Sequence, residues 1–352
     1  MINQLEKSDK KYALTRTYTS RKVRNEYFDF LRGIAIMMVV AIHTYPAASI
    51  TGYNTLGDDI LLITRQILNS AVPLFLAISG YFLARKVLVS RKEIFDFWKK
   101  QIARVYIPLL VWGAGWFLLS LVKEPTLSSG LINLAKLLTG GFTVYYFVAL
   151  IIQCYISLPL LQKAKFGGVI CCIIISLLAI ILTEYLIYKE GHNFPLLLYA
   201  GPIYLWIAFF MLGIYLRVNS NANYLKIGIV LTLLGLLMQI GESYFLLSNY
   251  GKGVGIKFSS FIFSIGLILL LFSPRLQQIY KTSKIGRWIA WIGEVSFGVY
   301  LVHMYFVTGF QRILGTDNWL VMWISSLMIT LTTIYVLRCI IPASTLKKYF
   351  GF

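Results

Sequence analysis

The sequence predicts an all-α integral membrane protein, with about ten transmembrane helices in one bundle and both termini in the cytoplasm. Of its 352 residues, 58% are hydrophobic and only 13% are charged, which is unlike a soluble domain. Apolar runs of about 20 residues, the length needed to cross a hydrocarbon core of about 30 Å, recur from Phe30 onwards. Lys and Arg gather in alternate connections, as is typical of cytoplasmic loops.

The apolar runs and the polar breaks between them define the expected spans. These are residues 30–50, 60–84, 105–122, 143–162, 167–188, 196–216, 225–247, 257–273, 289–310 and 319–338. The first 27 residues are basic and read as a cytoplasmic tail, residues 28–340 as one transmembrane domain, and residues 341–352 as a cytoplasmic C-terminal tail. The sequence shows no internal repeat.

The distribution of positive charge predicts the orientation. With the N-terminus inside, the cytoplasmic segments hold 25 of the 33 Lys and Arg residues and the outer loops hold six, while Arg32 and Arg65 lie within spans. The net charge of +19 indicates contact with anionic membrane lipids and no nucleic acid, because the basic residues are spread over every inner loop. The four cysteines lack metal-ligand spacing, so no metal is expected.

Two connections are long enough to hold a helix of their own. Residues 85–104 mix apolar and basic residues in a pattern that predicts an amphipathic helix at the inner membrane interface. Residues 123–142, in the largest outer loop, have room for one short re-entrant or interfacial helix.

The first span carries three ionisable residues, Asp29, Arg32 and His43. Eleven residues at about 100° per residue return Arg32 and His43 to one face of a helix, about 16 Å apart along its axis. Arg32 therefore lies at the cytoplasmic end and His43 about halfway across. Ionisable residues at this depth usually face the bundle interior or a water-filled cavity. The alternatives are an interhelical hydrogen bond for His43 and snorkelling to the interface for Arg32.

This pattern resembles the signature of the acyltransferase-3 family of membrane acyltransferases, an Asp-x-Leu-Arg-Gly motif with ten residues between the arginine and a histidine. Further segments are similar to the family in the same order, over roughly residues 25–310. They are Val72-Pro73-Leu74-Phe75, Ser79-Gly80-Tyr81, Arg104 with Pro108, Leu158-Pro159-Leu160-Leu161, and Ser296-Phe297-Gly298-Val299-Tyr300-Leu301 with His303.

The resemblance implies an acyl-CoA donor, usually acetyl-CoA, and a hydroxyl acceptor on a surface or lipid-linked glycan, in the cytoplasmic membrane of a bacterium. Cytosolic CoA carries several phosphate charges, so its binding needs cations at the inner face. Arg32, Lys99, Lys100 and Arg104 are expected there. Gln101 stands where the family often has an arginine, so binding would depend more on lysines, which act as point charges.

Transfer to a hydroxyl requires a base, and a neutral imidazole suits this role near neutral pH. His43 is the candidate base. Asp29 is about 20 Å from His43 by helical rise, too far to orient it, so Asp29 is expected to pair with Arg32 or to order the cytoplasmic mouth.

Four further residues are candidates for binding the substrates. Arg65 and Asn69, one turn apart in the second span, could bind the acceptor glycan, and Tyr300 or His303, which share a helix face in the ninth, could hold the acyl carbonyl. Snorkelling for the first pair and polar packing between helices for the second are the alternative interpretations. Ser79 and Tyr81, beside Gly80, indicate a tight helix–helix contact.

A transporter or flippase of glycans or lipid-linked sugars is the competing class, because polar residues near the midplane of a helical bundle would serve it equally. Against it, the two halves of the chain show no repeat symmetry. A succinyl or longer acyl donor is a third possibility. The oligomeric state is not indicated by the sequence.

Overall fold

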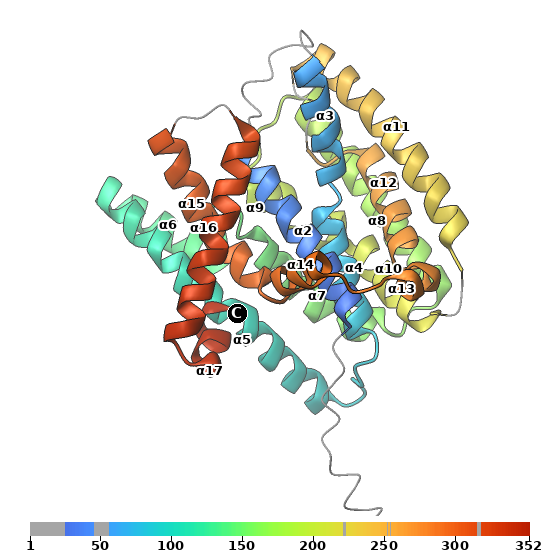
Figure 1. Ribbon diagram of the computed structural model, residues 1–352, viewed down its shortest axis with the longest axis horizontal. Helices are drawn as coiled ribbons and strands as arrows, with labels where there is room; N and C mark the ends of the chain where they lie inside the picture. Colours follow the sequence, from blue (N-terminus) through green and yellow to red (C-terminus); the bar gives the residue numbers. More distant parts are fainter. Residues whose placement is uncertain (1–24, 46–55, 221–222, 252, 254, 315–317) are drawn as a thin grey trace, which may run out of the picture.

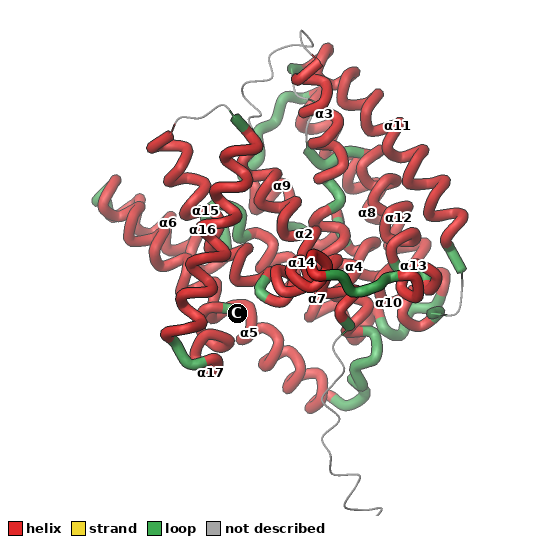
Figure 2. Tube along the Cα trace, in the orientation of Figure 1, coloured by secondary structure: helices red, strands yellow, loops and turns green. Residues whose placement is uncertain are grey.

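The computed structural model describes residues 25–45, 56–220, 223–251, 253, 255–314 and 318–352. Every regular element in this part of the chain is a helix, and it contains no strand (Figures 1 and 2). The first described helix, α2 (Glu26–Thr44), lies at the centre and packs against α3, α4, α14, α15 and α16. The helix that carries the Arg32 and His43 motif is therefore surrounded by protein.

Six helical segments of the described chain are long and apolar enough to cross a membrane. They are Glu26–Thr44, Leu56–Leu83, Arg91–Lys123, Phe166–Lys189, Leu225–Tyr250 and Trp319–Ile340. A seventh span results if α14 (Lys284–Glu294) and α15 (Ser296–Leu314), which are bent by 79°, are counted as one. Three shorter apolar helices complete the bundle, namely α7 (Tyr146–Leu161), α10 (Ile207–Val218) and α12 (Phe258–Leu271). The all-helical membrane architecture is confirmed, whereas the number ten and the orientation remain predictions.

The other elements connect or extend these helices. The segment Leu56–Leu83 is formed by α3 (Leu56–Leu68) and α4 (Ala71–Leu83), and the segment Phe166–Lys189 by α8 (Phe166–Glu184) with a π-helical end (Tyr185–Lys189). The next long segment is α11 (Leu225–Tyr250). The last span is α16 (Trp319–Ile340). Short segments are α9 (Leu196–Ala200), a 3-10 turn (Ile203–Leu205) and α13 (Pro274–Ile279).

The inner interfacial helix expected over residues 85–104 is not a separate element. It is the first part of α5 (Arg91–Lys123), which runs without interruption into the third span and whose first turns protrude at the bottom of Figure 1. Ser90 and Glu93 cap its start reciprocally, with backbone-to-side-chain hydrogen bonds of 3.1 and 2.8 Å. No break in the backbone separates the amphipathic part from the apolar part, although Pro108 lies between them. The helix expected within residues 123–142 is present as α6 (Leu127–Thr139).

Glycines allow α2 to approach α14 closely, and α4 to approach α10. A Cβ atom on Gly33 would lie 2.0 Å from the Ile289 carbonyl oxygen of α14, and one on Gly293 would lie 1.8 Å from the Asp29 carbonyl oxygen of α2. Gly80 and Gly213 bring α4 and α10 together in the same way, with corresponding distances of 2.1 and 2.0 Å to backbone oxygens. The tight contact predicted around Gly80 is thus confirmed.

The last residues of the chain fold back onto the bundle. After α16 come a short α17 (Ala343–Thr345) and a π-helical turn (Leu346–Phe350) that packs against α5, where Figure 1 places the C-terminus. Leu346 is 1% exposed, and the Trp112 indole N–H donates to the Phe350 carbonyl oxygen at 3.2 Å. The segment predicted as a cytoplasmic tail is therefore an ordered part of the fold.

Candidate active site

One cavity of about 680 Å³ runs between the central helix and its neighbours. Arg32 and His43 both line it, as their shared helix face predicts, and helical rise places them about 16 Å apart along its wall. Further lining residues come from α4, α5, α7, α15 and the C-terminal segment. They include Val72, Phe75, Ser79, Phe82, Gln101, Arg104, Tyr146, Phe147, Tyr155, Ser296, Phe297, Tyr300, Gly351 and Phe352. The cavity therefore joins the two ends of the sequence motif.

The end of the cavity at Arg32 is strongly basic. In the described part of the chain its lining holds five Lys and Arg side chains and one carboxylate, that of Glu294; the cations are Arg32, Lys86, Arg104, Arg338 and Lys347. All five lie at or beside the segments that the charge distribution predicts to be cytoplasmic. We call this end the basic mouth.

Arg32 is held in place by two contacts. Its Nη1 lies 2.9 Å from the Asp29 Oδ1, which confirms the predicted pairing, and its guanidinium lies 4.9 Å from the centre of the Phe82 ring. Asp29 is 4% exposed while Arg32 is 29% exposed. The carboxylate is buried behind the guanidinium, which keeps part of its surface open to the cavity.

Two histidines meet at the deep end of the cavity. The ring centres of His43 and His303 are 5.5 Å apart; His43 is partly exposed and lines the cavity, whereas His303 is fully buried. The His303 Nδ1 lies 3.0 Å from the Val299 carbonyl oxygen, so Nδ1 carries the hydrogen and Nε2 is left as an acceptor with no partner. Tyr300 also lines the cavity, and its hydroxyl donates to the Val144 carbonyl oxygen.

Arg65 and Asn69 lie outside the cavity lining but close to its deep end. Arg65 donates to the Asn69 Oδ1, its guanidinium lies 5.9 Å from the Tyr45 ring centre, and its charge is within electrostatic range of His43. Asn69 in turn donates to Gln239 at 3.1 Å. The two residues thus form a polar group between His43 and the far end of the bundle.

Beyond this group lies a buried lysine that the sequence did not single out. Lys257 is fully buried; its ammonium lies 2.7 Å from the Gln66 Oε1 and also donates to the Ser243 hydroxyl. The charge distribution assigns Lys257 to an outer loop. Its burial could not be predicted, because its partners Gln66 and Ser243 are brought to it only by the fold. The hydrogen bonds of its ammonium in the described structure go to protein atoms of neighbouring helices and loops. A structural role is therefore enough to explain its burial.

Only two of the four predicted donor-binding cations line the cavity. Arg32 and Arg104 line the basic mouth, whereas Lys99 and Lys100 are exposed on α5 and are not among its lining residues. Lys86, Arg338 and Lys347, which sequence reasoning used only as markers of topology, line it instead. No local pattern marks these three residues, because they reach the mouth from separate segments.

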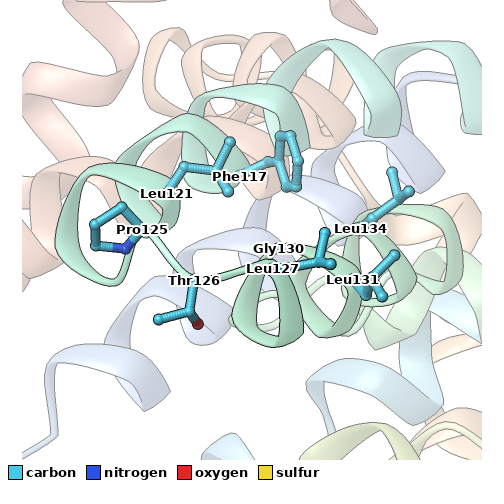
Figure 3. Close-up of a pocket in the computed structure, with 8 residues that line it drawn as sticks. All are labelled: Phe117, Leu121, Pro125, Thr126, Leu127, Gly130, Leu131 and Leu134. Atoms are coloured by element: carbon cyan, nitrogen blue, oxygen red, sulfur yellow. The ribbon is translucent and has the colours of Figure 1, made fainter.

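A second hollow lies between α5 and α6, away from both histidines. Figure 3 shows its lining, which is Phe117, Leu121, Pro125, Thr126, Leu127, Gly130, Leu131 and Leu134. None of these side chains titrates, and Leu127 and Leu131 are 82% and 61% exposed. In a membrane such a surface contacts lipid tails, so the chemistry belongs to the cavity around α2.

The fold and the cavity define a class of protein: a helical membrane protein whose buried site joins a basic mouth to an embedded histidine. A sequence model of the acyltransferase domain family matches residues 25–339, and the chain belongs to this family. The resemblance carried by the motif of the first span is therefore confirmed, and it supports a membrane acyltransferase.

One curated relative shares much of the chain. A serine/alanine racemase of Enterococcus gallinarum is 28% identical over 338 residues, which cover 88% of this chain and 45% of the racemase. The chain thus spans less than half the length of that relative. No solved structure matches the chain significantly.

Proposed function

We propose that the protein is an O-acyltransferase of the bacterial cytoplasmic membrane that moves an acetyl group from cytosolic acetyl-CoA to a hydroxyl of a cell-surface or lipid-linked glycan. The observation that supports this most is the single cavity shared by the basic mouth and His43. A donor that is polyanionic at one end and carries its acyl group at the other matches that arrangement.

The donor enters from the cytosol with its phosphates at the mouth. Arg32 and Arg104 contact them, while the exposed Lys99 and Lys100 on α5 add a positive potential that attracts the anion. Asp29 holds Arg32 in its orientation. Between the mouth and His43 the wall is largely apolar, with Ile36, Val39 and Phe75 among its residues, and it suits the uncharged thioester arm.

His43 is the general base of the transfer. It takes the proton of the acceptor hydroxyl as the hydroxyl oxygen forms a bond to the acetyl carbon, the carbon–sulfur bond breaks, and the CoA thiolate leaves. The proton then passes from His43 to the thiolate, which regenerates the base. His303, whose Nε2 is an acceptor without a partner in the described structure, lies beside the His43 ring and gives the protonated imidazole an acceptor to turn towards.

The acceptor approaches from the opposite end of the bundle. Arg65 has further guanidinium N–H donors there for the polar glycan, and Asn69, which accepts from Arg65 and donates to Gln239, holds that guanidinium in position. The Tyr300 hydroxyl already donates to Val144, so its oxygen remains free to accept a hydrogen bond from a neighbouring hydroxyl of the same sugar, while the attacking hydroxyl donates to His43. The acyl group is thereby delivered across part of the bilayer.

The test is CoA release by the purified full chain, reconstituted in nanodiscs with acetyl-CoA and with or without an extract of lipid-linked glycans. We expect release to depend on the acceptor and the acetyl label to appear on the glycan. If labelled glycan crosses the membrane of reconstituted vesicles while acetyl-CoA is left intact, the protein is a transporter and the proposal is wrong.

A further inference from the structure

We propose that residues 338–352 complete the donor site, and that Arg338 and Lys347 bind phosphate groups of the acyl donor. This inference rests on the proposed function, because it assumes a phosphorylated thioester as donor. The new element is one wall of the donor site, formed by the end of α16 and the residues after it. These residues lie outside the motifs that carry the family resemblance.

The segment is fixed in position by packing on both sides. Leu346 is 1% exposed, and the Trp112 indole of α5 donates to the Phe350 carbonyl oxygen at 3.2 Å. Gly351 adopts a left-handed φ of +84°, which directs the chain back towards α15. Gly298 of α15 leaves space for the Phe352 ring, since a Cβ atom there would lie 2.3 Å from it.

This packing makes the segment a wall of the cavity that contains Arg32 and His43. Gly351 and Phe352 line the cavity, and so do the side chains of Arg338 and Lys347. Phe352 is 8% exposed, so its ring is a fixed part of the wall. A substrate in the cavity would contact the C-terminal segment on one side and α2 on the other.

The charges of the lining favour a ligand with several negative charges. Arg338 and Lys347 face a mouth that already holds Lys86, Arg104 and Arg32, and the charge of Arg32 is paired with the Asp29 carboxylate. Cations from three separate segments can contact a polyphosphate at more than one of its phosphates. The enrichment of Lys and Arg in cytoplasmic loops does not by itself require these cations to meet at one cavity.

A lipid headgroup is a second source of phosphate, because both cations lie at the inner end of their elements. The shared chemistry is a phosphate bound by Arg and Lys. The cavity favours the soluble donor, since its lining continues from these cations to His43. Measurements in lipids with and without negative charge separate the two sources.

The experiment measures dissociation constants of the full chain in neutral phosphatidylcholine nanodiscs for two probes, acetyl-CoA and S-acetylpantetheine, which lacks phosphates. Lys347→Ala and Arg338→Ala should each weaken acetyl-CoA binding about tenfold and leave S-acetylpantetheine binding unchanged. Lys348→Ala is the matched control. Lys348 is the next residue, equally exposed and equally charged, but it lies against the Tyr349 ring and does not line the cavity.

Three outcomes would overturn the inference. Equal acetyl-CoA affinities in Lys347→Ala and Lys348→Ala, with binding by the unaltered chain, would reject the C-terminal wall and leave the proposed function standing. Failure of the unaltered chain to bind acetyl-CoA would reject both. If the substitutions reduce retention of phosphatidylglycerol in anionic nanodiscs but leave acetyl-CoA affinity in neutral ones unchanged, the cations bind headgroups instead.

Discussion

Arg32 and Arg104 reach the same cavity under different constraints. Arg32 is braced by the Asp29 carboxylate and the Phe82 ring, so its guanidinium is oriented before any ligand arrives. Arg104, by contrast, is exposed at the mouth. A ligand that orders Arg104 must offset the lost freedom of its side chain, whereas Arg32 has already lost it.

Arg104 lines the cavity and can contact the donor directly, whereas Lys100 does not line it and can act only through its long-range potential. Arg104→Ala should weaken acetyl-CoA binding about tenfold, because it removes a charge-assisted contact within the mouth. Lys100→Ala should weaken it less than about threefold, and this effect should vanish in 1 M salt, where the Debye length is about 3 Å. Binding isotherms of both variants at low and high salt check this. A larger loss for Lys100→Ala would place the phosphates on the outer face of α5.

Residue positions within one helix were predictable from the sequence. The eleven-residue spacing placed Arg32 and His43 on one wall, and the three-residue spacing brought Asp29 to Arg32. The proximity of His43 to His303 was not predictable, because those residues are far apart in the sequence and meet only through the packing of α15 on α2.

At the scale of elements, α14 holds α2 at the cavity. The two helices approach through Gly33 and Gly293, which leave room for backbone oxygens of the partner helix. Gly33 follows Arg32 directly, and Glu294 follows Gly293 and lines the cavity. The glycine of the Asp-x-Leu-Arg-Gly motif therefore has a packing role, and the residues beside it form the mouth.

Adding a methyl group at this contact should destabilise the fold. Gly293→Ala should lower the free energy of unfolding by about 1–3 kcal/mol, because its Cβ atom would overlap the Asp29 carbonyl oxygen. Gly309→Ala in α15 is the control, since nothing lies within 4 Å of that position. Thermal unfolding of both variants in one detergent gives the comparison. An unfolding temperature for Gly293→Ala equal to that of the control would show that the close contact does not form.

The elements differ in how well the sequence predicted them. Long apolar helices were found because hydrophobic length is a local signal. The continuity of α5 was missed because a basic amphipathic stretch reads as interfacial whether or not its helix continues into the membrane. The packing of the C-terminal segment depends on Trp112 and Gly298, which no local pattern connects to it.

At the scale of the whole molecule, the basic mouth and the predicted inner loops lie at the same end of the bundle. The mouth contains Lys86, which follows α4, Arg104 from the first half of α5, and Arg338 near the end of α16. Phosphorylated CoA is cytosolic, so the proposed function requires this end to face the cytosol. Orientation is therefore part of the mechanism.

Cysteine labelling in intact cells tests the orientation. A cysteine at Lys92, near the start of α5, should resist a membrane-impermeant maleimide, and one at Glu124, at the end of the same helix, should react. The 33 residues of α5 span about 50 Å, enough to separate the two sites across a bilayer. Asn54, the outer site that the sequence suggests, lies outside the described residues. Labelling at position 92 from outside would place the basic mouth where no CoA is present.

The helical architecture was predictable at this scale, and its division into ten spans stays a prediction. Each of the ten expected spans contains a helix or a broken helix, and six helical segments in the described chain are long and apolar enough to cross a membrane, or seven with the bent pair. Breaks such as the 79° bend between α14 and α15 depend on tertiary contacts with α2. Sequence hydropathy registers only the summed apolar length.

In the proposed mechanism, the cavity delivers an acyl group to a hydroxyl that His43 activates. The most direct measurement is acetyl transfer to the glycan acceptor by His43→Ala, compared with the unaltered chain in the same nanodiscs. We expect turnover to fall at least about 100-fold, with acetyl-CoA affinity and unfolding temperature unchanged, because a general base is lost while the basic mouth remains. Turnover close to that of the unaltered chain would contradict the assignment of His43 as the base.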